Sequence, residues 1–118
     1  MLIKVISCLF LYFFPSNSLE SLTDTFSLLQ QFQTNSLGPL RIFKGVENRL
    51  SQGSKFIIIT SKLGSITGNG KDGSVFAGGL YGYRMSKTAV NMAAKSLSID
   101  LKDKGIAVAL LHPGYREN

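Results

Sequence analysis

A chain of 118 residues provides one small domain with a core of moderate size, and it is too short for a second domain. Hydrophobic residues make up 44% of the chain and charged residues 17%, a composition that is typical of globular proteins and excludes an intrinsically disordered chain. The net charge of +6 comes from Lys and Arg residues that are scattered rather than clustered into the basic runs of nucleic-acid-binding proteins, so we expect no nucleic-acid partner.

Cys8 and His112 are the only residues of their types. A single cysteine can form neither an intrachain disulfide nor a cysteine-based metal site. One histidine is too few for an ordinary structural zinc site. We therefore expect no bound metal.

Residues 1–18 differ in composition from the rest of the chain. A short basic start is followed by the apolar run 5–14 and then by small polar residues. This order is typical of a secretory signal peptide, although the run is too short to span a bilayer. A truncated gene start translated by chance, or a buried strand, would look the same, because Val, Ile, Phe and Tyr also favour β-sheets. We favour truncation, which separates residues 1–18 from a folded segment 19–118 and places the protein in the cytoplasm; a genuine leader would make it a secreted protein.

We predict two helical pieces between residues 22 and 50. Apolar residues recur there every three or four positions, which places an apolar stripe along one face of a helix. Gly38-Pro39 should kink or interrupt this helix, because proline supplies no amide donor and clashes with the preceding turn. We therefore expect helices at about 22–34 and 38–50. The stripe consists of Leu22, Phe26, Leu29, Phe32, Leu37, Leu40, Phe43, Val46 and Leu50.

The second half of the chain predicts a strand, a helix and a strand. Residues 55–60 form a short, continuously apolar run, which is typical of a buried parallel strand. A glycine-rich loop follows at 64–82, then a helix at 83–102 with a glycine at its end, and then a second buried strand at 106–111. Strand, helix and strand in this order make a βαβ unit. The predicted fold class is therefore α/β with a parallel sheet.

Tyr83 and Lys87 are the most informative pair. They stand four residues apart on the predicted helix, so both side chains leave the same face one turn apart. A nearby ammonium group favours the phenolate form of a tyrosine, which makes the phenol a better proton donor or acceptor near neutral pH. The spacing alone is not specific, because any surface helix can carry Tyr and Lys four residues apart.

Two further candidates follow the predicted strands. Ser61 comes directly after the first strand, and Pro113-Gly114 comes after the second. In an open parallel sheet, ligands bind outside the carboxyl ends of the strands, so both strand ends and the start of the helix should meet in one crevice. Each residue also has an ordinary explanation, because a serine can terminate a strand and Pro-Gly is a common turn pair.

Taken in order, these segments closely resemble the serine, tyrosine, lysine and proline-glycine pattern of the short-chain dehydrogenase/reductase family. An upstream segment resembles the part of the family that supplies its fourth catalytic residue. The resemblance covers residues 19 to about 115, and it is most similar to members of the carbonyl reductase and C-factor type. The segments are QTNSLGP at 33–39, TSKLGS at 60–65, YRMSK at 83–87 and LHPG at 111–114.

The resemblance implies a role for each matching residue. Tyr83 would donate the proton to a carbonyl, and Lys87 would favour the phenolate and hold the nicotinamide ribose. Ser61 would donate a hydrogen bond to the substrate oxygen where negative charge develops. Ser65 is the alternative for this role, and we prefer Ser61 because it lies nearer the end of the strand.

The resemblance also implies a cofactor, NADP or NAD, and a small carbonyl or alcohol substrate. Asn35 would place a water beside Lys87 in a proton relay, and Pro113 and Gly114 would shape the nicotinamide pocket. Asn35 has an ordinary explanation as well, because it could satisfy backbone groups at the break before Gly38.

The resemblance covers the catalytic half of the family's fold, and the N-terminal, nucleotide-binding half of that fold has no counterpart in this sequence. The fold it implies is a partial Rossmann-like fold, a doubly wound parallel sheet lacking the N-terminal nucleotide-binding strands. The segment 68–73 fits the G-x-G-x-x-G fingerprint, but we interpret it as a coincidence because the preceding strand ends well upstream of it and no helix starts after it. We therefore expect the strand at 55–60 to lack a neighbour on one side, and the 118 residues alone neither to bind NAD(P)H nor to turn over a substrate.

The predicted function is an NAD(P)-dependent oxidoreductase that is incomplete as this chain. The alternative is a non-catalytic remnant or interaction protein that docks on a full-length relative, since family members commonly dimerise through the two helices corresponding to 22–50 and 83–102. A small secreted protein is a third interpretation, which rests on the leader-like start.

Overall fold

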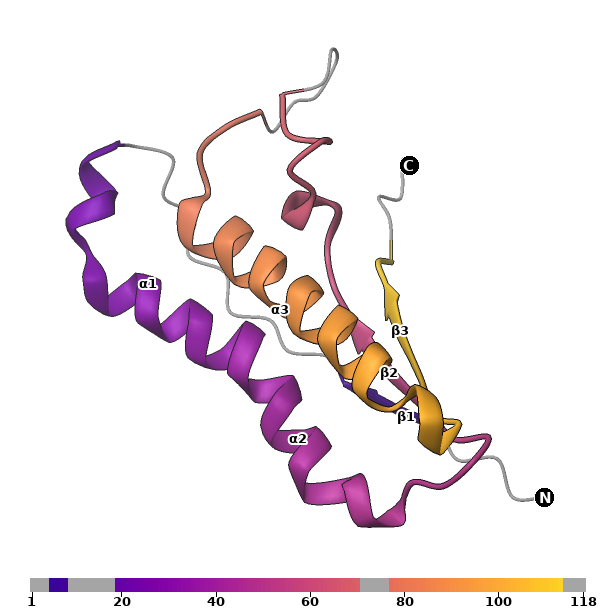
Figure 1. Ribbon diagram of the computed structural model, residues 1–118. Coiled ribbons are helices and arrows are strands. Elements are labelled where there is room, and N and C mark those ends of the chain that lie inside the picture. Colours follow the sequence, from indigo (N-terminus) through magenta and orange to yellow (C-terminus); the bar gives the residue numbers. More distant parts are fainter. Residues whose placement is uncertain (1–4, 9–18, 71–76, 114–118) are drawn as a thin grey trace.

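The computed structural model describes residues 5–8, 19–70 and 77–113. Its three strands form one parallel sheet in the order β1-β2-β3 (Figure 1). The register places Ile6 opposite Phe56, and Phe56 opposite Val108. This parallel sheet with helices confirms the predicted α/β class. The strands are β1 (Val5–Cys8), β2 (Lys55–Ile59) and β3 (Ala107–Leu111).

The pairing of β2 corrects one expectation. We predicted that this strand would lack a neighbour on one side, but β1 pairs with it on one side and β3 on the other. The apolar run at the start of the chain supplies β1, because its β-favouring residues provide backbone partners for β2. β3 also differs from the prediction of a buried strand: most of its residues are exposed, since it lies at the edge of the described sheet.

The two predicted helical pieces form one long helical segment with a change of winding (Figure 1). Five residues of π-helix stand directly before Gly38-Pro39, and the α-helix resumes at Gly38. Pro39 lies in the first turn of the new helix, where its missing amide costs no hydrogen bond. In chain order the segment consists of a 3₁₀ turn (Leu19–Thr23), α1 (Thr25–Phe32), the π-helical segment (Gln33–Leu37), α2 (Gly38–Val46) and a 3₁₀ turn (Glu47–Arg49).

The helix between the last two strands, α3 (Tyr81–Asp100), completes the predicted βαβ unit. A 3₁₀ turn, Lys102–Lys104, follows it, and Gly105 ends this turn with a φ of 67°. This left-handed conformation favours glycine, as the sequence predicted. A further 3₁₀ turn, Lys62–Gly64, follows β2.

The core lies between one face of the sheet and the helices. Phe56 and Ile58 of β2 are fully buried, and the Phe56 ring makes an edge contact with Phe43 of α2 at a centroid distance of 5.4 Å. Ile57 and Ile59, which point to the other face, are only half-buried. The described helices therefore cover one face of the sheet. The remaining buried members of this core are Val90, Ala94, Leu101 and Ile106.

The apolar stripe predicted for the first helix is exposed along α1 and is not part of the core there. Phe26 is 72% exposed and Leu29 55% exposed. The buried face of α1 instead carries Ser27 and Gln31, which pack toward α3. The two helices approach closely at this point, because a Cβ at Gly82 of α3 would collide with the Gln31 side chain and lie 3.0 Å from Leu28 Cδ2.

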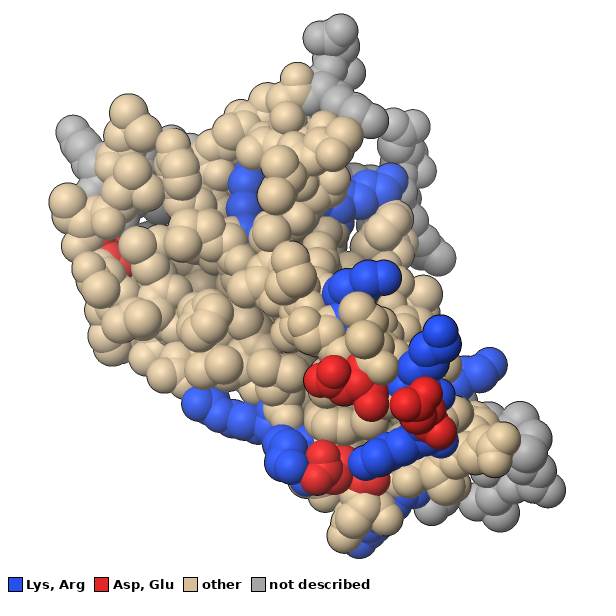
Figure 2. All heavy atoms as spheres, viewed as in Figure 1, with Lys and Arg blue, Asp and Glu red and all other residues tan. Residues whose placement is uncertain are grey.

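Charged residues are distributed unevenly over the face seen in Figure 2. They gather over the ends of α2 and α3, whereas the surface over α1 carries few of them (Figure 2). No helix among the described residues is long and apolar enough to cross a bilayer.

Candidate functional site

Tyr83 and Lys87 lie in the first turns of α3, and the structure buries both of them. Tyr83 is 7% exposed and Lys87 2% exposed. The Lys87 Nζ lies 5.8 Å from the centroid of the Tyr83 ring, within the range of a cation–π contact. The predicted pairing of these two side chains on one helix face is therefore present.

The Lys87 ammonium group also ties α3 to the carboxyl end of β2. Its Nζ donates a hydrogen bond of 3.3 Å to the carbonyl oxygen of Ile59, the last residue of that strand. Burial lowers the pKa of Lys87 below its ordinary value, because the charged form loses hydration. An ammonium of this kind gives up its proton more readily than a surface lysine does.

Asn35 is brought to the same part of α3 by the π-helical segment. It is buried, and its Nδ2 donates to the Ser86 Oγ at 3.0 Å. The Ser86 hydroxyl in turn donates to the Tyr83 carbonyl oxygen at 2.7 Å. The neighbouring Ser36 hydroxyl donates to the Ser86 carbonyl oxygen. Asn35, Tyr83 and Lys87 are thus held around one turn of α3.

Ser61 stands two residues beyond β2 and lines a cavity of about 520 Å³. Its hydroxyl caps the following 3₁₀ turn by accepting a hydrogen bond from the Leu63 amide at 3.2 Å. Ser65, the alternative for the serine role, lines the same cavity and accepts a hydrogen bond from the Gly68 amide. Both candidate serines therefore face one cavity.

The structure does not bring all the predicted residues into this cavity. Asn35, Tyr83 and Lys87 are not among the described residues that line it. The two groups are connected through β2, because Lys87 bonds to Ile59 and Ser61 follows two residues later. The candidate site therefore consists of a buried cluster on α3 and an adjacent open cavity.

The end of β3 contributes less than expected. His112 lines the cavity, and both His112 and Pro113 are exposed. Gly114 lies outside the described residues. The roles predicted for Pro113 and Gly114 therefore stay predictions.

Polar residues of α3 to which the sequence pattern assigned no role hold the segment carrying Ser61. The Thr88 hydroxyl donates to the Gly64 carbonyl oxygen at 2.8 Å, and the Thr60 hydroxyl donates to the Asn91 Oδ1 at 2.6 Å. Arg84, one turn before Thr88, bonds to the Leu63 carbonyl oxygen. Arg84, Thr88 and Asn91 recur at helical spacing, which is the signal that could have identified this polar face.

Gly64 allows this close contact between the serine-bearing segment and α3. A Cβ at this position would lie 3.0 Å from the backbone carbonyl carbon of Lys87 and 3.1 Å from the Asn91 Nδ2. We expect Gly64→Ala to lower the free energy of unfolding by about 1–3 kcal/mol, because the segment must move away from the helix.

Thermal unfolding followed by circular dichroism checks this expectation. Gly45→Ala in α2 is the matched control: a Cβ there meets nothing within 4 Å, so alanine should raise stability by about 0.4–1 kcal/mol. A Gly64→Ala protein as stable as the parent would show that the approach is not tight.

Comparison with known proteins gives the family. No family model matches the chain. It is 42% identical over 85 residues to the 1-hydroxy-2-glutathionyl-2-methyl-3-butene dehydrogenase of Rhodococcus sp. (strain AD45), an alignment that covers 72% of this chain and 35% of the relative. It is 40% identical over 94 residues to C-signal of Myxococcus xanthus, with 78% of this chain and 53% of the relative covered.

Solved structures agree with these relatives. The carbonyl reductase Sniffer of D. melanogaster superposes with a TM-score of 0.74 at 31% identity, covering 94% of this chain and 47% of that chain. A carbonyl reductase of Pseudomonas aeruginosa in complex with NADP superposes with a TM-score of 0.73 at 23% identity, over 97% of this chain and 48% of that chain, and this likeness is one of fold.

This chain therefore belongs to the short-chain dehydrogenase/reductase family. It spans about a third to a half of the length of these curated relatives. The α/β fold and the resemblance predicted from the sequence are confirmed.

Proposed function

We propose that this chain carries the catalytic residues of an NAD(P)-dependent oxidoreductase that acts on small carbonyl or alcohol substrates. The observation that carries the proposal is the packing of Lys87 against the Tyr83 ring at the carboxyl end of β2. A buried ammonium beside a phenol is an arrangement that supports proton transfer to or from a substrate oxygen.

In this proposal Tyr83 is the general acid in the reduction of a carbonyl and the general base in the reverse direction. Lys87, whose ammonium group lies against the Tyr83 ring, donates to a ribose hydroxyl. Ser61 donates to the substrate oxygen as negative charge develops on it. Asn35, fixed through Ser86, orients a water for the proton relay.

The residues present fit the nicotinamide ribose. A buried ammonium at a strand end is a donor that ribose hydroxyls accept, and ligands of open parallel sheets bind at this edge. Lys87 would hold the ribose, and Pro113 and Gly114 would line the nicotinamide pocket. When bound, the cofactor supplies the hydride. We propose NADP over NAD because one of the similar carbonyl reductase structures holds NADP.

A chimaera tests the proposal, because the chain covers only part of its relatives. This chain replaces the segment of Sniffer that it matches, and NADPH oxidation is measured with 4-nitrobenzaldehyde. We expect aldehyde-dependent oxidation in the chimaera and none with the 118-residue chain alone. A folded chimaera that binds NADPH but does not reduce the aldehyde would contradict the proposed catalytic residues.

A second candidate function is association through the exposed apolar face of α1. Phe26 and Leu29 are more than half exposed, and Leu22 and Phe32 are about 40% exposed on the same helical segment. Apolar side chains grouped in this way mark protein–protein contact surfaces. A copy of this chain, or a full-length relative, would cover this face through the α1–α2 and α3 helices.

Analytical ultracentrifugation of the purified chain tests this association. We expect Phe26→Glu to shift the chain toward the monomer, since a carboxylate would be buried without a partner in the contact. Leu111→Glu is the control, because Leu111 is 50% exposed on β3, away from this face of α1. A parent chain that is monomeric at all concentrations would exclude self-association.

A further inference from the structure

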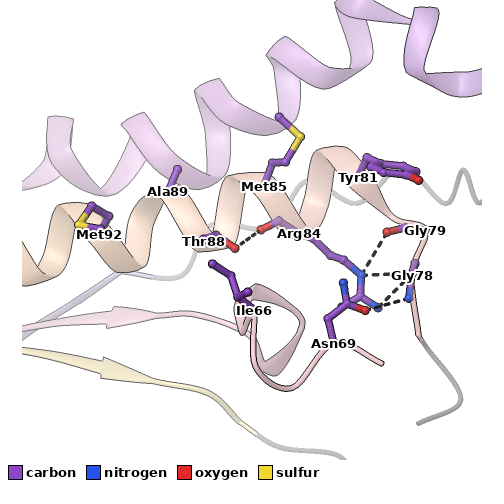
Figure 3. A pocket seen from close by; sticks show the side chains of 10 residues that line it. All are labelled: Ile66, Asn69, Gly78, Gly79, Tyr81, Arg84, Met85, Thr88, Ala89 and Met92. Carbon is purple, nitrogen blue, oxygen red and sulfur yellow. Dashed lines mark hydrogen bonds between the residues drawn. The ribbon is translucent and has the colours of Figure 1, made fainter. Parts of the chain in front are cut away.

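The loop between β2 and α3 is fixed at both ends by one buried side chain. Arg84 is 8% exposed although it lies on a helix next to a cavity (Figure 3). Its Nη1 donates to the Leu63 carbonyl oxygen at 3.3 Å, near the start of the loop. Its Nε donates to the Gly79 carbonyl oxygen at 3.1 Å, and its Nη2 donates to the Gly78 carbonyl oxygen at 3.1 Å, near the end of the loop.

The backbone before α3 is shaped to meet this guanidinium group. Gly78, Gly79 and Leu80 have φ values of 67°, 61° and 51°, so three residues in a row are left-handed. Leucine rarely adopts this conformation, and Leu80 is nonetheless buried at the start of α3. The turn directs two carbonyl groups at Arg84 (Figure 3). The hydrogen bonds from the guanidinium group offset the strain of this turn.

Arg84 also stands between two cavities. It lines the cavity that contains Ser61, and it lines a second one of about 640 Å³ on the outer side of α3, bounded by Ile66, Met85 and Met92. Arg84 directly follows Tyr83 on α3, and its guanidinium group bonds to Leu63, two residues after Ser61. The segment carrying Ser61 is thereby tied to the turn of α3 that carries Tyr83. A planar fork that donates in several directions is suited to this task, whereas an ammonium is not.

We propose that Arg84 is a positioning residue of the oxidoreductase site, which clamps both ends of the loop onto α3 and thereby fixes Ser61 relative to Tyr83. This inference rests on the proposed function. Arg84 acts through the backbone carbonyl groups that it holds. Its effect on the reaction is to hold the oxyanion donor and the proton donor in one geometry, and small displacements of such groups lower turnover strongly.

Hydrogen exchange of the full 118-residue chain tests the clamp without any need for activity. We expect Arg84→Met to raise amide exchange about 10- to 100-fold in peptides covering residues 60–68 and 77–82, because several charge-assisted hydrogen bonds are lost. Peptides from α2 should exchange as in the parent. Arg41→Met is the matched control, because Arg41 is exposed and its Nη2 donates to the side chain of Gln33 rather than to the loop.

Turnover in the Sniffer chimaera tests the positioning role. With NADPH and 4-nitrobenzaldehyde, we expect Arg84→Met to lower kcat about 10- to 100-fold while the KM for NADPH stays within about twofold. Arg84→Lys keeps the charge, is less disruptive to folding and cannot form the fork, so it should recover less than half of the lost kcat. Circular dichroism confirms that the variants fold.

The two experiments distinguish the clamp, the positioning role and the proposed function. Unchanged exchange in both Arg84 variants would overturn the clamp. Raised exchange with an unchanged kcat, or full rescue by lysine, would overturn the positioning role and leave the proposed function standing. A chimaera that folds and binds NADPH but does not reduce the aldehyde before any substitution would overturn the proposed function and with it the positioning role, while the exchange data would still decide the clamp.

Discussion

Tyr83→Phe should lower carbonyl reduction by the chimaera about 10²- to 10⁴-fold, the contribution that general acid catalysis ordinarily makes. The substitution removes one hydroxyl and keeps the ring that faces the Lys87 ammonium, so the packing at the start of α3 should persist. The measurement is kcat for NADPH-dependent reduction of 4-nitrobenzaldehyde, together with the thermal unfolding midpoint.

Tyr81→Phe is the matched control for this prediction. Tyr81 lies two residues earlier on α3 and lines the other cavity, so its hydroxyl should be dispensable. Activity of Tyr83→Phe within about twofold of the parent would remove Tyr83 from the role of general acid.

Lys87→Met should weaken NADPH binding, and it should remove the loss of NADPH affinity at high pH that deprotonation of Lys87 causes in the parent. Methionine keeps most of the stem and removes the ammonium that would hold the ribose. Because burial lowers the pKa of Lys87, the parent should lose cofactor affinity as the pH rises through this lowered value. The variant should bind weakly, with no such transition. Fluorescence titration of the chimaera with NADPH from pH 7 to 10 measures both effects.

The stability of the 118-residue chain provides a second measurement on Lys87. A folded-state pKa below the unfolded-state value means that the unfolded chain binds more protons in the interval between the two values. The free energy of unfolding should therefore rise with pH across this interval, and Lys87→Met should flatten the rise. Lys95→Met is the control, because Lys95 is an exposed residue of the same helix. Equal slopes in the parent and in Lys87→Met would contradict the burial effect.

The βαβ order and the proximity of Tyr83 to Lys87 could be predicted because both depend on local pattern. A continuous apolar run indicates a strand, and a spacing of four residues fixes two side chains on one helix face. The location of Ser61 after β2 followed from the same pattern. The sequence pattern did not predict that Ser61 lines the cavity whereas Tyr83 and Lys87 do not, because this depends on how the loop after β2 packs.

The packing of the first helix could not be predicted from the spacing of its apolar residues. Periodicity identifies which residues share a face, but not which neighbour that face meets. In the structure, Ser27 and Gln31 face α3 because Gly82 lets the two helices approach closely, and the apolar residues such as Phe26 point outward. The clamp by Arg84 could not be predicted either: Gly78-Gly79 indicates a turn, but not which side chain the carbonyl groups of that turn meet.

The attachment of both loop ends to one guanidinium group has a consequence for how such a loop can vary. The anchors at Leu63 and at Gly78 and Gly79 are held by the same side chain, so the distance between them is set by Arg84 rather than by the residues that connect them. Insertions or deletions between the anchors would alter the rim of the cavity while leaving the serine and the tyrosine in place. One buried arginine thus separates the part of the chain that can diversify from the part that must stay constant.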